Sequence, residues 1–508
     1  MSLPMKRILS LVTLFFLTSG FAGASVIRIA DQDSFDRLGR TIKEEISRKE
    51  KVIRVEIQPG HYKFSERHIE LAEMRCPDVA ISITGKDVVL SGKGEHGPFK
   101  LSVGLIDTKA GRGVPMFREL KQALSVAEIL DPSTGLCRMA VDEAPVASKK
   151  AGNMYILITQ WYRAKYYPVK EITEGFVYFM APGVTDDRNP ATSPNADFHY
   201  AKELPRYAIL NHPARRDVPL FKKKRLRSPK GTRLERCDAG CFLRIAGGEF
   251  RSVTISGIEF LGSGGDGPLI NFHRCGLKDG AKVSGCVFDG IKGDVLRVDA
   301  APSFTFADNV VRNCHANGVE IVAGTRNAVI RHNRFINNGL DVYNYFCVRC
   351  QGINFLIADN YFEDFTYGAI GVGIWYKSPD KVIDCSGIVE NNECCLSPAF
   401  NSGVYRNLMD SGAIYTWTIN TDVTIRNNYI HDISGPYENR GIFCDDGTVN
   451  VKLLSNRVEK VSNSYCIDLR RVLSVETAEG SRIKRANVGN VMKDNVVDGS
   501  VRFEQREK

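Results

Sequence analysis

The sequence lacks any hydrophobic run long enough to cross a membrane. Its most apolar segment, residues 8–17, has about ten residues, whereas a membrane-spanning helix needs roughly 20. Lys6 and Arg7 precede this segment and the small residues 22–24 follow it, which is the order found in a secretory signal peptide. We therefore expect cleavage after Ala24 and a mature protein exported to the periplasm or the extracellular space of a bacterium.

The sequence is also poor in signs of a metal or nucleic-acid site. Cys347 and Cys350 form a CxxC pair, but no second pair lies nearby to complete a zinc site. The most basic run, residues 221–227, has no aromatic residues interleaved with its cations to stack on bases. We expect no metal, no cofactor and no nucleic-acid partner. The net charge of +9 suits a polyanion such as an acidic polysaccharide.

Cysteine, in contrast, is not scarce, and fourteen cysteines in an exported chain allow disulfides. Most of them lie in strand-like segments, as Cys286, Cys394 and Cys466 do, where a thiol packs as a small hydrophobic group. Cys237 and Cys241 are close enough in sequence to be bridged. The sequence leaves both outcomes open.

A short strand, then Asn or Gly, then a second short strand recurs through the second half, as in "VTISGIEF", "FLIADNYF" and "VTIRNNYI". The anchor positions are Gly257, Gly285, Asn309, Asn333, Asn360, Asn392, Asn428, Asn456 and Asn495. Spacings of 24 to 39 residues, with apolar residues alternating inside each unit, are typical of a parallel β-solenoid. Asn and Gly tolerate left-handed backbone at a corner, and stacked Asn side chains can hydrogen-bond from coil to coil.

We therefore predict an all-β parallel β-helix with an insertion. Residues 1–24 are the expected signal peptide, and residues 25–100 should form a short capping helix and the first coils. The repeat stops over residues 101–250, where alternating, strand-rich sequence predicts an inserted β domain. Residues 251–508 should complete the β-helix and carry the functional site.

Two neighbouring segments, "DSGAIYTW" at 410–417 and "GIFCDDG" at 441–447, place carboxylates beside glycines and aromatics. Asp410 and Asp446 each lie 18 residues after an anchor, so in that register they stack at about 4.8 Å. Aligning "GAIY" with "RGIF" instead puts Asp410 before its strand and the Asp445–Asp446 pair after the next one. Both registers stay open. Adjacent strand residues face opposite ways, so only one Asp of that pair should enter a shared site.

Long spacings between Asn360 and Asn428 predict loops that rise from the coils. This region is rich in aromatic residues, whose faces can stack on sugar rings beside carboxylates. The candidate substrate-binding residues are Trp375, Tyr415, Trp417, His431, Glu438 and Arg440. Core packing of the aromatics and a plain turn histidine at position 431 are the alternatives.

The same segments, with "NNYIHDI", resemble motifs of bacterial right-handed parallel β-helix glycoside hydrolases, and the chain is most similar to glycoside hydrolase family 141. The resemblance covers about residues 250–460 and implies that Asp410 and either Asp445 or Asp446 are the catalytic carboxylates. It also implies a substrate among plant cell-wall glycans. The chain departs from the family pattern at Ser411, which replaces a glycine, and at Cys444 before the Asp pair.

Three functions follow from these observations. The leading hypothesis is an exported glycoside hydrolase in which one Asp protonates the glycosidic oxygen and the other acts as nucleophile or base. The second is a polysaccharide lyase, which would use Ca²⁺ or a basic residue to neutralise a sugar carboxylate. The third is a non-catalytic glycan-binding solenoid. In each case we expect a monomer with a polysaccharide or oligosaccharide partner.

Overall fold

The computed structural model describes most of the chain from Ala24 onward. The described residues are 24–95, 100–115, 120–160, 163–182, 204–213, 215, 219–222, 225–341, 345–373, 384–401, 411–417, 419–434, 439–445, 448–462, 464–469, 475–476, 482–483 and 489–503. No helix within these ranges is long and apolar enough to cross a membrane. The expected signal peptide falls almost wholly on residues 1–23, outside the described part.

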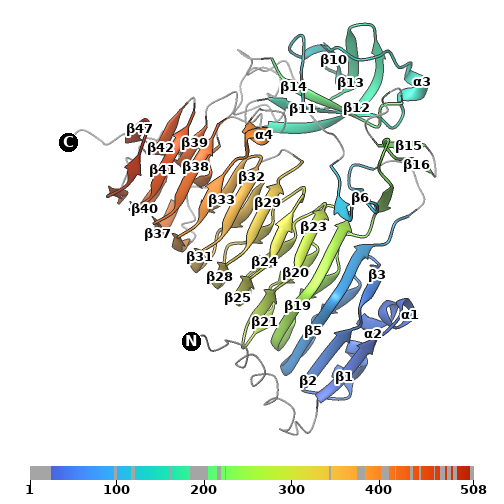
Figure 1. Cartoon of the computed structure of the whole chain (residues 1–508), viewed down its shortest axis with the longest axis vertical. Coiled ribbons are helices and arrows are strands. Elements are labelled where there is room, and N and C mark those ends of the chain that lie inside the picture. The colour runs from blue at the N-terminus through green and yellow to red at the C-terminus, as the bar shows by residue number, and fades with distance from the viewer. Residues whose placement is uncertain are drawn as a thin grey trace, which may run out of the picture.

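The chain winds into a stack of parallel coils (Figure 1). Each coil in the second half has two strands in a 22-stranded sheet, named sheet A here, and a third in an 11-stranded sheet, named sheet B. Strands one coil apart pair in parallel, as Phe306 does with Ile330 in sheet A and Val298 with Ile321 in sheet B. The predicted parallel β-helix is confirmed.

The elements before the insertion are β1 (Ala24–Ile29), α1 (Gln32–Asp36), α2 (Leu38–Ser47), β2 (Val52–Ile57), β3 (Gly60–Phe64), β4 (Ile69–Ala72) and β5 (Arg75–Gly92). The insertion contains β6 (Gly104–Asp107), β7 (Arg112–Gly113), β8 (Lys121–Gln122), β9 (Glu128–Asp131), β10 (Leu136–Ala140), α3 (Ser148–Ala151), β11 (Tyr155–Gln160), β12 (Arg163–Thr173), β13 (Phe176–Met180), β14 (Arg206–Leu210), β15 (Leu220–Lys222), β16 (Arg225–Arg227) and β17 (Leu234–Cys237).

The elements after the insertion are β18 (Leu243–Ala246), β19 (Glu249–Ser263), β20 (Ile270–His273), β21 (Gly276–Leu277), β22 (Ala281–Ser284), β23 (Val287–Ile291), β24 (Leu296–Asp299), β25 (Pro302–Ala307), β26 (Val310–Arg312), β27 (Val319–Ile321), β28 (Arg326–Arg331), β29 (Arg334–Asn338), β30 (Phe346–Cys350), β31 (Ile353–Ala358), β32 (Tyr361–Phe365), β33 (Gly368–Gly373), β34 (Ser386–Glu390), β35 (Glu393–Cys395), α4 (Pro398–Asn401), β36 (Ile414–Trp417), β37 (Ile419–Arg426), β38 (Tyr429–Ile433), β39 (Arg440–Cys444), β40 (Val449–Leu454), β41 (Arg457–Val461), β42 (Tyr465–Leu469), β43 (Val475–Glu476), β44 (Arg482–Ile483), β45 (Val491–Lys493), β46 (Val496–Val497) and β47 (Val501–Phe503).

A ladder of buried asparagines joins the coils at the predicted anchors. It runs through Asn309, Asn333, Asn360, Asn392, Asn428, Asn456 and Asn495. In each step the side-chain oxygen of one Asn accepts from both the backbone N–H and the side-chain amide of the Asn before it, at 2.9–3.1 Å. The left-handed backbone lies one residue earlier than predicted, for example at Asp359 (φ 56°), whereas Gly257 and Gly285 take it themselves.

Aromatic rings stack inside the helix beside this ladder. Neighbouring rings lie with centroids 4.9–6.4 Å apart along the series Phe242, Phe260, Phe288, Phe306, Phe335 and Phe362. Cys394 takes the next position, paired with Phe362, and Ile430 the one after it. All fourteen cysteines are free thiols, and thirteen are buried. The predicted packing of most of them as small core residues is confirmed, as at Cys286, Cys394 and Cys466, and Cys347 and Cys350 also belong to the core.

The insertion lies over the outer face of sheet B. It is built on a 7-stranded antiparallel sheet, β8–β14–β11–β12–β13–β10–β9. Leu157, Leu210 and Phe221 of the insertion belong to one apolar cluster with Phe346 and Tyr367 of sheet B. The solenoid resumes at Leu243, where β18 pairs with β4, eight residues before the predicted boundary. The four residues of β18 are too short to show the repeat in the sequence.

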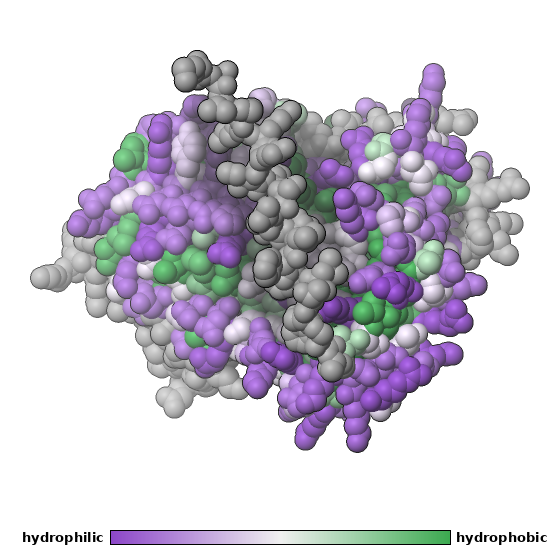
Figure 2. All heavy atoms as spheres, turned by 60° about the horizontal axis from the view of Figure 1, so that its bottom comes forward, coloured by the Kyte–Doolittle hydropathy of each residue, from purple (hydrophilic) through white to green (hydrophobic). Residues whose placement is uncertain are grey.

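Two short helices stand at the N-terminal end, where the sequence predicts one capping helix (Figure 1). Phe35 of α1 and Ile42 of α2 are fully buried and belong to the solenoid core. The ring of His68 packs against both Phe35, at 4.3 Å, and Phe242, at 5.9 Å, and these two rings also contact each other at 6.4 Å. On the side shown in Figure 2, hydrophilic residues predominate and separate the hydrophobic ones into small patches.

Replacing Asn360 by Leu should destabilise the fold by about 2 to 5 kcal/mol, because it leaves the buried Asn333 N–H and the Ile330 carbonyl without partners. Urea denaturation measures this change. Asn354→Gly is the matched control, since the exposed Asn354 already has φ 55°, its side chain donates to Asn327, and its backbone N–H, which donates to Ser386, is kept in the variant. We expect a change within about 1 kcal/mol there. Equal effects at the two positions would contradict a structural role for the ladder.

His68 should make the fold acid-sensitive. Burial lowers the pKa of His68 to about 4 in the folded state, against about 6.5 in an unfolded chain. The unfolded state therefore binds the proton first as the pH falls, so stability is full above about pH 6.5 and is lost toward pH 4. His68→Phe should reduce the loss between pH 7 and 4.5 by about 2 to 3 kcal/mol, whereas the exposed His332→Phe should not.

Candidate functional site

The sheet has the second of the two registers that the sequence allows at the carboxylate motifs. Ile414 of β36 pairs with Ile442 of β39, Tyr415 with Phe443 and Thr416 with Cys444. Asp445 follows the end of β39, and its N–H donates to the Thr416 carbonyl at 2.9 Å. The 18-residue count is therefore not the register of these strands, because loops of unequal length separate the anchors from them.

Four predicted site residues lie outside the described part of the chain: Asp410, Asp446, Trp375 and Glu438. Asp410 directly precedes the described segment 411–417, and Asp446 directly follows Asp445. Their roles stay predictions.

Asp445 is held by a tyrosine from the neighbouring coil. The Tyr415 hydroxyl donates to Asp445 Oδ2 at 2.7 Å, and both residues are buried, with 3% and 6% of their surface exposed. This hydrogen bond fixes the orientation of the Asp445 carboxylate. The ring of Tyr415 is enclosed by Phe346, Tyr367 and Phe443, with centroids 5.3–6.0 Å away. Tyr415 thus offers its hydroxyl, not its ring face.

Trp417 and Arg440 occupy packed positions near Asp445. Trp417 is partly buried against the apolar cluster between sheet B and the insertion. Arg440 is fully buried and donates to Asp468 at 2.6 Å, with its guanidinium 4.1 Å from the Phe443 ring centre. Arg502 also donates to Asp468 from the next coil. The Arg440 guanidinium is thus part of a buried ion network, and the role of Arg440 in substrate binding stays a prediction.

His431 lies in sheet A, apart from the strands that carry Asp445. Its Nδ1 is 2.7 Å from Asp432 and its Nε2 is 3.3 Å from Glu393. Tyr429 stacks on the imidazole at 4.3 Å. The structure therefore brings together Tyr415, Trp417 and Asp445 but not His431.

A buried cluster that the sequence reading missed lies at the turns between sheet A and sheet B. Lys292 Nζ donates to both carboxylate oxygens of Asp341, at 2.7 and 2.5 Å. His315 Nδ1 lies 3.0 Å from the same carboxylate, and the Tyr166 hydroxyl reaches it from the insertion at 3.4 Å. The Lys292 ammonium and His315 oppose burial and hold the pKa of Asp341 down at about 2.

His315 is the member of this cluster with spare bonding capacity. The residue is 1% exposed, and its Nε2 has no hydrogen-bond partner among the described residues. Burial lowers the pKa of His315, so the imidazole is neutral at pH 7. With Nδ1–H donated to Asp341, Nε2 carries a lone pair, which is the state of a general base.

A second polar group follows in the same turns. Asp294 accepts from the Asn317 backbone N–H and side-chain amide at 3.1 and 3.0 Å and shares a hydrogen bond with Glu320. Arg297 and Arg349 flank Glu320 at 3.0 and 3.4 Å. Burial, together with the Glu320 carboxylate, raises the pKa of Asp294 to about 7. This turn edge therefore holds a carboxyl group whose protonated form is favoured by its surroundings, in addition to the neutral imidazole of His315.

One sequence signal could have found these residues. Lys292, His315 and Asp341 follow the anchors Gly285, Asn309 and Asn333 by six to eight residues. Residues at one offset in successive coils lie in a column along the solenoid.

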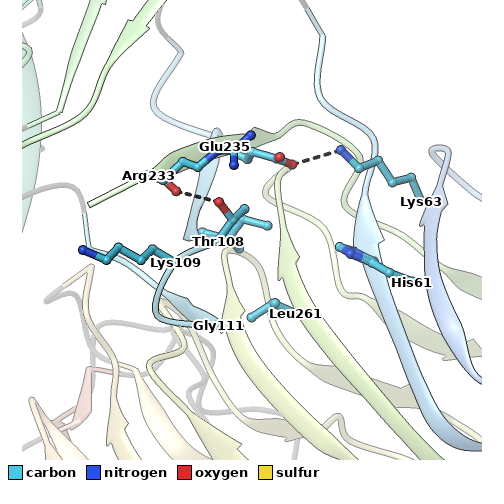
Figure 3. A pocket seen from close by; sticks show the side chains of 9 residues that line it. His61, Lys63, Thr108, Lys109, Gly111, Arg233, Glu235 and Leu261 are labelled. Atoms are coloured by element: carbon cyan, nitrogen blue, oxygen red, sulfur yellow. Dashed lines mark hydrogen bonds and ion pairs between the residues drawn. The ribbon is translucent and has the colours of Figure 1, made fainter. Parts of the chain in front are cut away.

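A separate cavity of about 590 Å³ lies between β3 and the first and last strands of the insertion, β6 and β17 (Figure 3). Lys63 pairs with Glu235 at 2.9 Å, and His61 lies beside them on β3 (Figure 3). Lys109 and Arg233 also line the cavity and have no ion-pair partner among the described residues. The cavity thus has an excess of positive charge, and β3, which lines it, lies nearer the N-terminal end of the solenoid than β39 (Figure 1).

Comparison with known proteins gives distant structural neighbours only. No protein-family model and no curated protein matches the chain. A structure described as the complex of XylC with xylose shares 9% identity over 88% of this chain and 70% of that one, with a TM-score of 0.40. The A-module of a mannuronan C-5 epimerase from Azotobacter vinelandii shares 9% identity over 96% of both chains, with a TM-score of 0.43.

The catalytic domain of a GH87 alpha-1,3-glucanase in complex with nigerose shares 10% identity over 80% of this chain and 99% of that one, with a TM-score of 0.23. These similarities are too low to assign an activity. The function must be argued from the chain's own side chains, and membership of glycoside hydrolase family 141 stays a prediction.

Proposed function

We propose that the protein is an exported glycoside hydrolase that cleaves a polysaccharide with Asp445 as one of its catalytic carboxylates. The observation that carries this proposal is the 2.7 Å hydrogen bond from Tyr415 of β36 to Asp445, which directly follows β39. Asp445 would act at the anomeric carbon, either directly or through a water, and Asp410 would protonate the leaving glycosidic oxygen. Tyr415 is the positioning residue, because its hydroxyl orients the Asp445 carboxylate through Oδ2.

Asp445→Asn should lower kcat/KM on a responsive polysaccharide by about 100- to 10,000-fold, the range for loss of a catalytic carboxylate. The assay is release of reducing sugar. Tyr415→Phe should lower kcat more than it raises KM, because it removes the donor but keeps the packed ring.

Asp422→Asn is the matched control, since Asp422 lies in the same coil as Asp445. Its carboxylate is exposed and pairs with Lys452. The activity of this variant should equal that of the wild type. Activity retained in Asp445→Asn would refute the hydrolase proposal.

A second candidate, a polysaccharide lyase, is favoured by the Lys292–His315–Asp341–Tyr166 cluster. In a β-elimination, His315 Nε2 would take the proton from the carbon next to a sugar carboxylate, and the C–O bond to the leaving sugar would break as a C=C bond forms. Asp341 would orient the imidazole through Nδ1, as the 3.0 Å contact allows. Tyr166 is the candidate donor of a proton to the leaving oxygen, and Lys292 the local positive charge.

The lyase candidate predicts that the protein forms an ultraviolet-absorbing unsaturated product from a uronate-containing polysaccharide. The rate of formation of this product should fall by at least about 100-fold in His315→Gln. His332→Gln is the matched control, because His332 is a solvent-exposed imidazole one coil away between Asp308 and Asp359. Absorbing product that persists in His315→Gln, or that is absent from the wild type on every uronate polymer tried, would exclude this reaction.

A further inference from the structure

Three metal-ligating side chains meet on the outer surface of sheet A, away from the residues proposed for catalysis. Glu393 and Cys395 are two positions apart on β35, so they face the same side of the sheet. His431 on β38 pairs directly with Cys395 in the neighbouring coil. One ligand atom from each of the three lies within 4.8 Å of the other two.

The imidazole is oriented as a metal ligand would be. His431 Nδ1 lies 2.7 Å from Asp432 Oδ2, and this hydrogen bond with the imidazole lowers the pKa of Asp432. With Nδ1–H donated to an ionised carboxylate, the Nε2 lone pair faces Glu393 Oε1 at 3.3 Å. Two acceptors at that distance repel each other unless a cation, either a proton or a metal ion, lies between them.

The surroundings divide into a closed and an open side. Cys395 is 7% exposed, and its sulfur lies 3.6 Å from the Tyr361 hydroxyl. A bound divalent ion ionises such a thiol outright. The Glu393 side chain is 46% exposed, so a metal ion and a water can approach from its side.

We propose that Glu393, Cys395 and His431 form a binding site for one divalent transition-metal ion of the Zn²⁺ type, with a fourth position open to water. A donor set of one nitrogen, one oxygen and one sulfur favours such an ion over Ca²⁺ or Mg²⁺, which prefer oxygen ligands. Three protein ligands plus an open position are the pattern of an accessible zinc site. Asp432 is the positioning residue that fixes the tautomer of His431. The site is independent of the function proposed above.

Titration of the chelator-treated full-length protein with Co²⁺ tests this site, because a cobalt–thiolate bond gives a charge-transfer band in the near ultraviolet. The wild type should bind one Co²⁺ with this band, and Zn²⁺ should displace it. Cys395→Ser should lose the band, and His431→Asn should bind far more weakly. Asp432→Asn should lower the affinity by about 10- to 100-fold while keeping the band.

His332→Asn is the matched control, because His332 also lies between two carboxylates, those of Asp308 and Asp359. It should leave Co²⁺ binding unchanged. Circular dichroism of the metal-free variants separates loss of a ligand from loss of the fold. Absence of the band in the wild type, or an undiminished band in folded Cys395→Ser, would overturn the proposal and leave a protonated His431–Glu393 ion pair as the account of the contact.

Discussion

The hydrogen bonds between stacked asparagines are the constraint on which the rest of this protein depends. Each buried Asn accepts from the backbone N–H of the Asn one coil before it, so one residue type at one corner fixes the register of the two sheet A strands that flank it. Because buried polar groups are costly when unpaired, a slip of one residue would break several such bonds together. The ladder therefore fixes the position of the strands in each coil, and with it the point at which the following turn begins.

The residues proposed to carry chemistry lie in or beside the turns between the strands, where the length and sequence of the chain can vary without breaking the ladder. Turns between sheet A and sheet B differ in length from coil to coil, yet Lys292, His315 and Asp341 meet there because each leaves its anchor at nearly the same offset. The insertion covers the outer face of sheet B and buries Tyr415 there. Its Tyr166 hydroxyl also reaches Asp341 in the neighbouring turns. The insertion covers one face of the solenoid, and the polar groups beneath it are thereby enclosed.

The sequence predicted the coil well and the site poorly, for a physical reason. Alternating strands around Asn309 or Asn333 are local patterns, and local patterns determine a coil. The pairing of Tyr415 with Phe443 depends on loop lengths summed over a whole coil, so two registers fitted the sequence equally. Arg440 was a candidate substrate-binding residue because the sequence does not show its partner Asp468, which lies in the following coil.

The mass of the products formed from neutral and uronate-containing polysaccharides tests the central claim most directly. Hydrolysis at Asp445 adds one water across each cleaved bond, so the account predicts saturated oligosaccharides with a new reducing end from the wild-type protein. Products lighter than these by one water, each with a double bond, would contradict the account and would instead support β-elimination with His315 as the base. Mass spectrometry of the same digests separates the two results without any substitution in the chain.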